Sequence, residues 1–117
     1  MRDFRYLDVW HKSHAFTLKI HAITEAFPKV ETYGLAATLR RTASQMTMKI
    51  AEAAGQDDAA DFARCLRNSR GIAVEVEYQV LLARDLHFIE PPAYDALQDQ
   101  VVEVRRMLSG LLRAQPV

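Results

Sequence analysis

Apolar residues recur at steps of three and four in four stretches of the chain, the spacing that places side chains on one face of an α-helix. The clearest stretch runs from Tyr33 to Gly55 and contains no proline. Its apolar face comprises Leu35, Leu39, Ala43, Met46, Ile50 and Ala53. The pattern predicts one continuous helix in this stretch, with nothing in it that demands a kink.

An earlier stretch predicts a helix from about Leu7 to Phe27. Its apolar face comprises Val9, Ser13, Phe16, Ile20, Ile23 and Phe27. Ser13 is the one polar member of this face. Pro28 is expected to end the helix, because the residue before a proline is pushed out of helical geometry.

The third predicted helix is long and runs to about Leu86 or His87. Asp57 is a good candidate for its N-cap. Its apolar face comprises Phe62, Cys65, Ser69, Ile72, Val76, Val80, Ala83 and Leu86. Gly71 in its interior costs about 1 kcal/mol relative to alanine, so we expect it to mark the close approach of a neighbouring helix.

The fourth predicted helix opens at Pro91 and Pro92, which suit a first helical turn, and ends at Pro116 at the latest. Its apolar face comprises Tyr94, Leu97, Val101, Val104, Leu108 and Leu111. No segment alternates with a period of two, so no sheet is expected. Four amphipathic helices with short connections predict an all-α fold, an antiparallel up-down-up-down four-helix bundle, with residues 1–117 as a single domain.

The charge balance limits the classes of partner. Fifteen basic and fifteen acidic residues cancel, so the whole molecule offers no long-range attraction to nucleic acid or to anionic membranes. Cys65 is the single cysteine, which excludes an intrachain disulfide and fits a reducing compartment. The polar N-terminal sequence does not resemble a signal peptide, and no run of about 18 apolar residues occurs. We expect a cytoplasmic protein without membrane contact.

Several apolar residues lie outside the four predicted faces. They are Trp10, Leu18, Val74, Leu81, Leu82, Met107 and Leu112. One interpretation is a wide core stripe, because globular helices often bury more than a third of their circumference. The other is a second apolar face used for self-association. The sequence favours neither.

Two residue groups carry candidate catalytic or metal chemistry. His14, His21 and Glu25 share a helical face and have the residue types that bind zinc, but a polar outer stripe is favoured because one helix cannot surround an ion. Cys65 lies on an apolar face, where a buried, inert thiol is expected rather than a nucleophile. Paired Glu-x-x-His motifs, a Gly-rich phosphate loop and a Gly-x-Ser-x-Gly elbow are all missing, so we expect neither a cofactor nor an enzyme.

Arginines and one lysine form a candidate nucleic-acid surface on two helices that are expected to be antiparallel neighbours. The set is Arg40, Arg41, Lys49, Arg64, Arg67 and Arg70. One local basic patch of this kind would bind phosphates of RNA or DNA with little sequence preference. The favoured alternative is a set of arginines on solvated faces, some of them paired with carboxylates. The carboxylates available are Asp57, Asp58, Asp61 and Glu75. We also expect Glu75 and Glu77 to pair across the bundle with Arg40, Arg41 or Arg105.

Four short motifs, taken in order, resemble those of the bacterial 23S rRNA intervening-sequence proteins. The central motif matches at Tyr33, Gly34, Leu35, Arg40, Arg41, Ile50, Ala51 and Glu52. The N-terminal motif matches at Leu7, Val9, Trp10 and Lys12. The two later motifs match at Glu75, Glu77, Leu81, Ala83 and Leu86, and at Arg106, Met107, Leu108, Gly110 and Leu111. Thr47 stands where the family often has proline, which predicts a straighter helix.

The resemblance implies a homopentameric ring of bundles and no known catalysis. The family is similar to the accessory variability determinant proteins of diversity-generating retroelements, for which the resemblance implies binding of nucleic acid and of a reverse transcriptase. The first function hypothesis is therefore a non-enzymatic oligomeric helical-bundle scaffold that binds nucleic acid or a nucleic-acid-associated protein partner. The alternative is a small metal-binding or catalytic bundle that uses the face of His14, His21 and Glu25.

Overall fold

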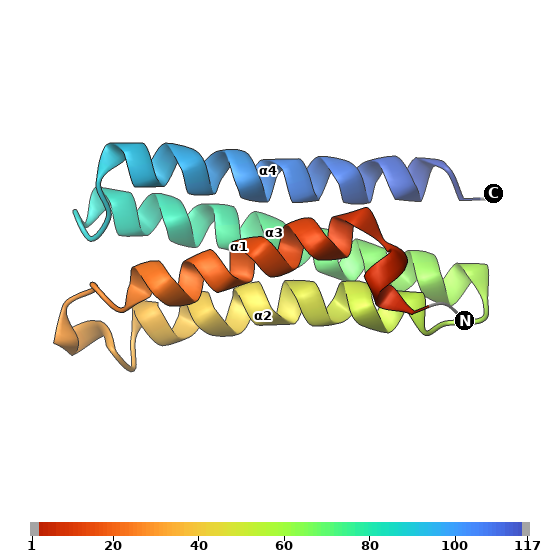
Figure 1. Ribbon diagram of the computed structural model, residues 1–117, viewed down its shortest axis with the longest axis horizontal. Helices are drawn as coiled ribbons and strands as arrows, with labels where there is room; N and C mark the ends of the chain where they lie inside the picture. Colours follow the sequence, from red (N-terminus) through yellow and green to blue (C-terminus); the bar gives the residue numbers. More distant parts are fainter. Residues whose placement is uncertain (1–2, 116–117) are drawn as a thin grey trace.

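Four long helices dominate the computed structural model, which describes residues 3–115 (Figure 1). They are α1 (Asp8–Thr24), α2 (Leu35–Ala54), α3 (Ala59–Asp85) and α4 (Pro91–Arg113). Two short 3-10 helices, η1 (Phe4–Tyr6) and η2 (Lys29–Glu31), precede α1 and α2. Residues 3–115 contain no strand, and none of their helices is long and apolar enough to cross a membrane. The predicted all-α four-helix bundle is confirmed.

Each helix runs antiparallel to the next, and both chain ends lie at the same end of the bundle (Figure 1). In that view α1 lies in front, α3 behind, α4 at the top and α2 at the bottom. Within residues 3–115, α3 contacts α2 and α4 but not α1. Helix α3 therefore has an outer face that no other described element covers.

The core follows the four apolar faces read from the sequence. Its largest fully buried side chains include Phe16, Ile20, Leu39, Met46, Ile50, Leu97 and Leu108. Leu66 is also fully buried, although it lies outside the predicted face of the third helix. Leu86 departs from the prediction: it lies just beyond the last residue of α3 and is 46% exposed.

Two helix ends differ from the predicted ones. Helix α1 stops at Thr24, yet Phe27 stays in the core, where its ring packs 5.4 Å from that of Phe88. Helix α3 is capped by Asp58 rather than Asp57, because an Asp58 carboxylate oxygen accepts the amide hydrogen bond of Ala60 at 3.1 Å. The spacing of apolar residues predicts where a helix lies but not its terminal residues, because local hydrogen bonds decide where the helix ends.

Helix α2 begins at a side-chain cap next to a glycine. The Glu31 carboxylate accepts the Leu35 amide hydrogen bond at 2.8 Å and so satisfies one of the free donors at the helix start. A Cβ atom added to Gly34 would lie 2.5 Å from the same carboxylate oxygen. A side chain at position 34 would therefore displace the Glu31 carboxylate from this hydrogen bond.

Gly71 behaves differently from the prediction. A Cβ atom added to Gly71 would meet nothing within 4 Å, and the residue is exposed. The expectation that it marks a close approach to a neighbouring helix of the same chain is wrong, because Gly71 lies on the uncovered face of α3.

Candidate functional surfaces

The six cations proposed as one basic patch are divided among different faces, and Arg40 is directed at α1. Its Nε donates to Thr24 Oγ1 at 2.8 Å and its Nη2 donates to the His21 carbonyl at 3.3 Å. The last carbonyls of a helix have no partners inside the helix. Arg40 thus holds the C-terminal end of α1 against α2.

Lys49 and Arg64 lie within a cluster of both signs on α2 and α3. Lys49 Nζ is 3.0 Å from a Glu52 carboxylate oxygen, and Arg64 is 3.5 Å from Asp61. The hydrogen bond from Lys49 lowers the pKa of Glu52 below its usual value, and the positive charges of Lys49 and Arg64 add to this effect. The local charge is therefore largely balanced.

The remaining three arginines also lie apart. Arg70 reaches toward α4, where its Nη1 is 3.4 Å from Ser109 Oγ. Arg41 on α2 and Arg67 on α3 are exposed, and within residues 3–115 neither makes an ion pair or a side-chain hydrogen bond. The two members of the predicted patch that are available to an external anion thus lie on different helices.

One expected pairing across the bundle is present. Arg105 Nε on α4 donates to a Glu77 carboxylate oxygen on α3 at 2.7 Å, and the Glu77 side chain is only 17% exposed. Glu77 thus has a structural partner. Glu75 is exposed and makes no ion pair with any residue of the described chain.

The histidine face of α1 is occupied by local contacts. The His14 ring stacks on Trp10, with ring centroids 4.8 Å apart and planes 9° from parallel. His11 Nε2 lies 2.7 Å from the Arg5 carbonyl oxygen and links η1 to α1. No group of three His, Cys, Asp or Glu side chains between residues 3 and 115 is placed to hold a metal ion, so His14, His21 and Glu25 do not come together as a ligand set.

Cys65 is buried on the inner face of α3, as predicted. Burial raises the pKa of its thiol above the ordinary value, and the negative charge of Glu52 raises it further. The thiolate is the nucleophilic form of cysteine, so this thiol is poorly reactive at neutral pH.

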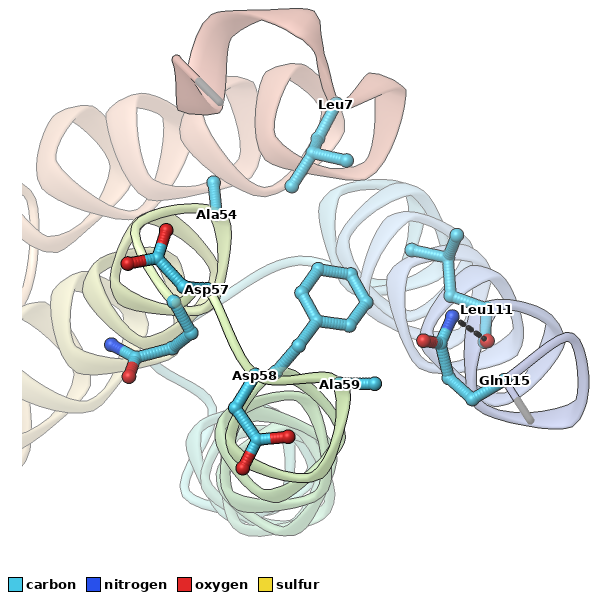
Figure 2. A pocket seen from close by; sticks show the side chains of 9 residues that line it. Leu7, Ala54, Asp57, Asp58, Ala59, Leu111 and Gln115 are labelled. Atoms are coloured by element: carbon cyan, nitrogen blue, oxygen red, sulfur yellow. Dashed lines mark hydrogen bonds between the residues drawn. The ribbon is translucent and has the colours of Figure 1, made fainter. Parts of the chain in front are cut away.

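A hollow of about 440 Å³ lies at the end of the bundle where α1 begins and α2 ends (Figure 2). Leu7, Ala54, Phe62 and Leu111 give it apolar walls contributed by distant parts of the chain. Asp58 at its edge is already used as the N-cap of α3. Sequence reasoning missed this hollow because no single motif marks it.

The apolar residues outside the four predicted faces divide into three groups. Leu81 and Leu82 on α3 are half-buried. Trp10, Met107 and Leu112 pack against the core, which supports the wide-stripe interpretation for these three. In contrast, Leu18 on α1 and Val74 on α3 are more than half exposed. Other large apolar side chains that are exposed include Tyr33, Met48 and Tyr78.

Comparisons with known proteins identify the family of this chain and a solved structure with a similar fold. The family model described as "23S rRNA-intervening sequence protein" matches residues 5–110. A solved structure from Bacteroides thetaiotaomicron VPI-5482, described as a protein with unknown function from the S23 ribosomal protein family, aligns with a TM-score of 0.84 at 20% identity. The alignment covers 91% of this chain and 96% of that one. No curated protein matches. The chain belongs to the 23S rRNA-intervening sequence protein family.

Proposed function

We propose that this chain is a non-enzymatic scaffold whose bundle assembles with further copies of itself. The observation that carries the proposal is the outer face of α3, where Val74 and Tyr78 are 54% and 61% exposed and follow Gly71 at helical spacing. Single exposed apolar residues are ordinary on a protein surface. Apolar residues that share one uncovered face are typical of an interaction site.

Gly71 supports the same proposal. A glycine in the middle of a helix is less favourable than alanine by about 1 kcal/mol. No atom of the described chain requires its small size, because a Cβ atom there would lie in open space. The close approach of a second molecule gives this glycine a physical reason.

The family resemblance adds the expectation of a five-fold ring. A cyclic ring joins two different patches of each copy. The connection between α1 and α2 offers a second apolar group, since Val30 and Tyr33 are 85% and 95% exposed. This group supports the proposal because it lies on a different part of the surface from the outer face of α3.

Light scattering after gel filtration tests the scaffold directly. We expect the purified protein at micromolar concentration to have the mass of several chains, not of one. A single-chain mass over the whole concentration range would contradict the proposal.

Nucleic acid is the second candidate partner, favoured by Arg41 and Arg67 of the predicted patch, which are exposed and make no ion pair within residues 3–115. Because the net charge is zero, each copy would bind weakly, and assembly would supply avidity. We expect RNA and DNA binding at low salt that weakens steeply as salt rises. The double variant Arg41→Ala with Arg67→Ala should lose this binding, while Lys19→Ala on α1 serves as control. Absence of wild-type binding at low salt would leave a protein as the external partner.

A further inference from the structure

Four arginines without a carboxylate partner lie on the adjacent helices α3 and α4. They are Arg67 and Arg70 on α3 and Arg106 and Arg113 on α4, which we name the α3–α4 arginine strip. Arg70 is half-buried and the other three are exposed. None of the four makes an ion pair within residues 3–115. The two arginines of α4 were not part of the patch predicted from the sequence.

One contact between the two antiparallel helices shows that these arginines are neighbours. Arg70 Nη1 lies 3.4 Å from Ser109 Oγ, so positions 70 and 109 are side by side. Arg67 comes three residues before Arg70. Arg106 comes three residues before Ser109, and Arg113 comes four residues after it. Because residues three and four apart are neighbours on a helix surface, all four arginines start within about one turn of this contact.

The side chain of Arg113 is directed back along α4 toward this contact. Its Nη2 atom lies 3.8 Å from the place that a Cβ atom would take on Gly110, the residue next to Ser109. Long side chains of a helix usually lie over the preceding turn. The charge of Arg113 is therefore closer to the other arginines than its position at the end of α4 suggests.

The length of the strip suits a chain of phosphates better than a single anion. Positions 106 and 113 are separated by about 10 Å along the axis of α4. One strand of duplex DNA carries a phosphate about every 3.4 Å along its axis, so about three phosphates span this distance. The guanidinium group matches phosphate oxygens with paired N–H donors, which makes arginine the usual residue for such contacts.

We propose that the α3–α4 arginine strip binds successive backbone phosphates of nucleic acid. This proposal rests on nucleic acid as a partner of the chain and names the contact surface, on α3 and α4 instead of α2 and α3. Backbone phosphates carry no sequence information, so the strip binds RNA and DNA of different sequences alike. Each further copy in an assembly repeats the strip and adds avidity.

Nearby carboxylates reduce the positive charge of the strip without cancelling it. Asp99 and Glu103 lie beside the same shallow hollow as Arg106, but neither forms an ion pair with it. Glu103 pairs with Lys12 of α1 at 3.5 Å. Asp99 is exposed and opposes phosphate binding at the α4 edge of the strip. The four arginines outweigh this one carboxylate, so the strip remains locally positive on a molecule whose net charge is zero.

Charge removal on α4 tests the strip, with binding of a labelled RNA and a labelled duplex DNA followed by fluorescence anisotropy at several salt concentrations. We expect Arg106→Ala with Arg113→Ala to weaken binding at low salt by about tenfold or more. The slope of log K against log salt should become shallower by about 2, because each lost phosphate contact removes about one unit. Both residues are exposed on the surface of α4, so the fold should be retained.

A second double variant is the matched control for total charge. Lys19→Ala with Lys29→Ala also removes two positive charges, but from α1 and η2. Both lysines are exposed and make no ion pair within residues 3–115. We expect this control to bind as the wild type does and to keep the wild-type slope. Circular dichroism and light scattering check that each variant keeps its fold and its assembled mass.

The outcomes separate the strip from nucleic-acid binding in general. A wild type that binds neither RNA nor DNA at low salt would overturn the strip together with nucleic acid as a partner. Binding that is unchanged in Arg106→Ala with Arg113→Ala, yet lost in Arg41→Ala with Arg67→Ala, would overturn the strip alone. Equal losses in the α4 variant and in the lysine control would also overturn the strip, because binding would then follow net charge.

Discussion

Two regions of the bundle depart from the usual distribution of polar and apolar residues, and they do so in opposite ways. Between α1 and α2, the hydroxyl residues Ser13, Thr17 and Thr47 are buried. On the outer face of α3, Val74 and Tyr78 are exposed. The buried hydroxyls find their partners inside the chain, whereas the exposed apolar side chains find none among residues 3–115. The first region joins two helices of the bundle, and the second carries the proposed contact with further copies.

The hydroxyl cluster is fully connected. Thr47 Oγ1 lies 2.6 Å from Ser13 Oγ and 2.9 Å from Thr17 Oγ1. Thr17 also donates to the Ala43 carbonyl at 3.1 Å. Because every hydroxyl has a partner, burial of these polar groups carries little penalty. Their small side chains leave room for α1 and α2 to pack side by side.

The largest expected effect on the free energy of unfolding comes from the buried hydroxyl cluster. Thr47→Val keeps the shape of the side chain but leaves the Ser13 hydroxyl without its partner. We expect the free energy of unfolding to fall by about 1–3 kcal/mol, measured by urea denaturation. The reverse exchange on the outer face of α3, Val74→Thr, is the matched control and should change the free energy of unfolding by less than about 0.5 kcal/mol.

A double variant shows whether the cluster acts as a unit. Ser13→Ala with Thr47→Val removes both partners, so the double variant should cost less than the sum of the two single variants. Strictly additive costs would show that the two hydroxyls contribute independently.

The next effect concerns two adjacent arginines of α2. Arg40→Ala removes the donors that bind Thr24 and the His21 carbonyl, so we expect a loss of about 1 kcal/mol in the free energy of unfolding. Arg41→Ala is the control, because Arg41 is exposed and has no partner in the described chain. Equal costs for the two variants would contradict the capping role of Arg40.

These two regions also show how far sequence reasoning reaches. The periodicity of apolar residues predicted all four helices, and Ser13 was recognised as the polar member of its face. The position of Arg40 was not predictable, because it depends on where α1 ends and on how α2 lies beside it. Val74 and Leu81 were noticed as apolar residues off the main face, but the sequence alone does not show which face of α3 is left uncovered. Only the packing of α3 against α2 and α4 shows that Gly71 and Tyr78 lie on its outer face.

Gly71→Ala separates the stability of one copy from the assembly of several. An alanine at this exposed helical position should raise the free energy of unfolding by about 0.4–1 kcal/mol, because nothing lies within 4 Å of its Cβ atom. The same methyl group occupies the space proposed for the close approach of a second copy, so assembly should weaken. Denaturation at a dilution where only single chains are present gives the free energy of unfolding, and sedimentation equilibrium gives the strength of assembly. Tighter assembly would show that no second copy approaches closely at Gly71.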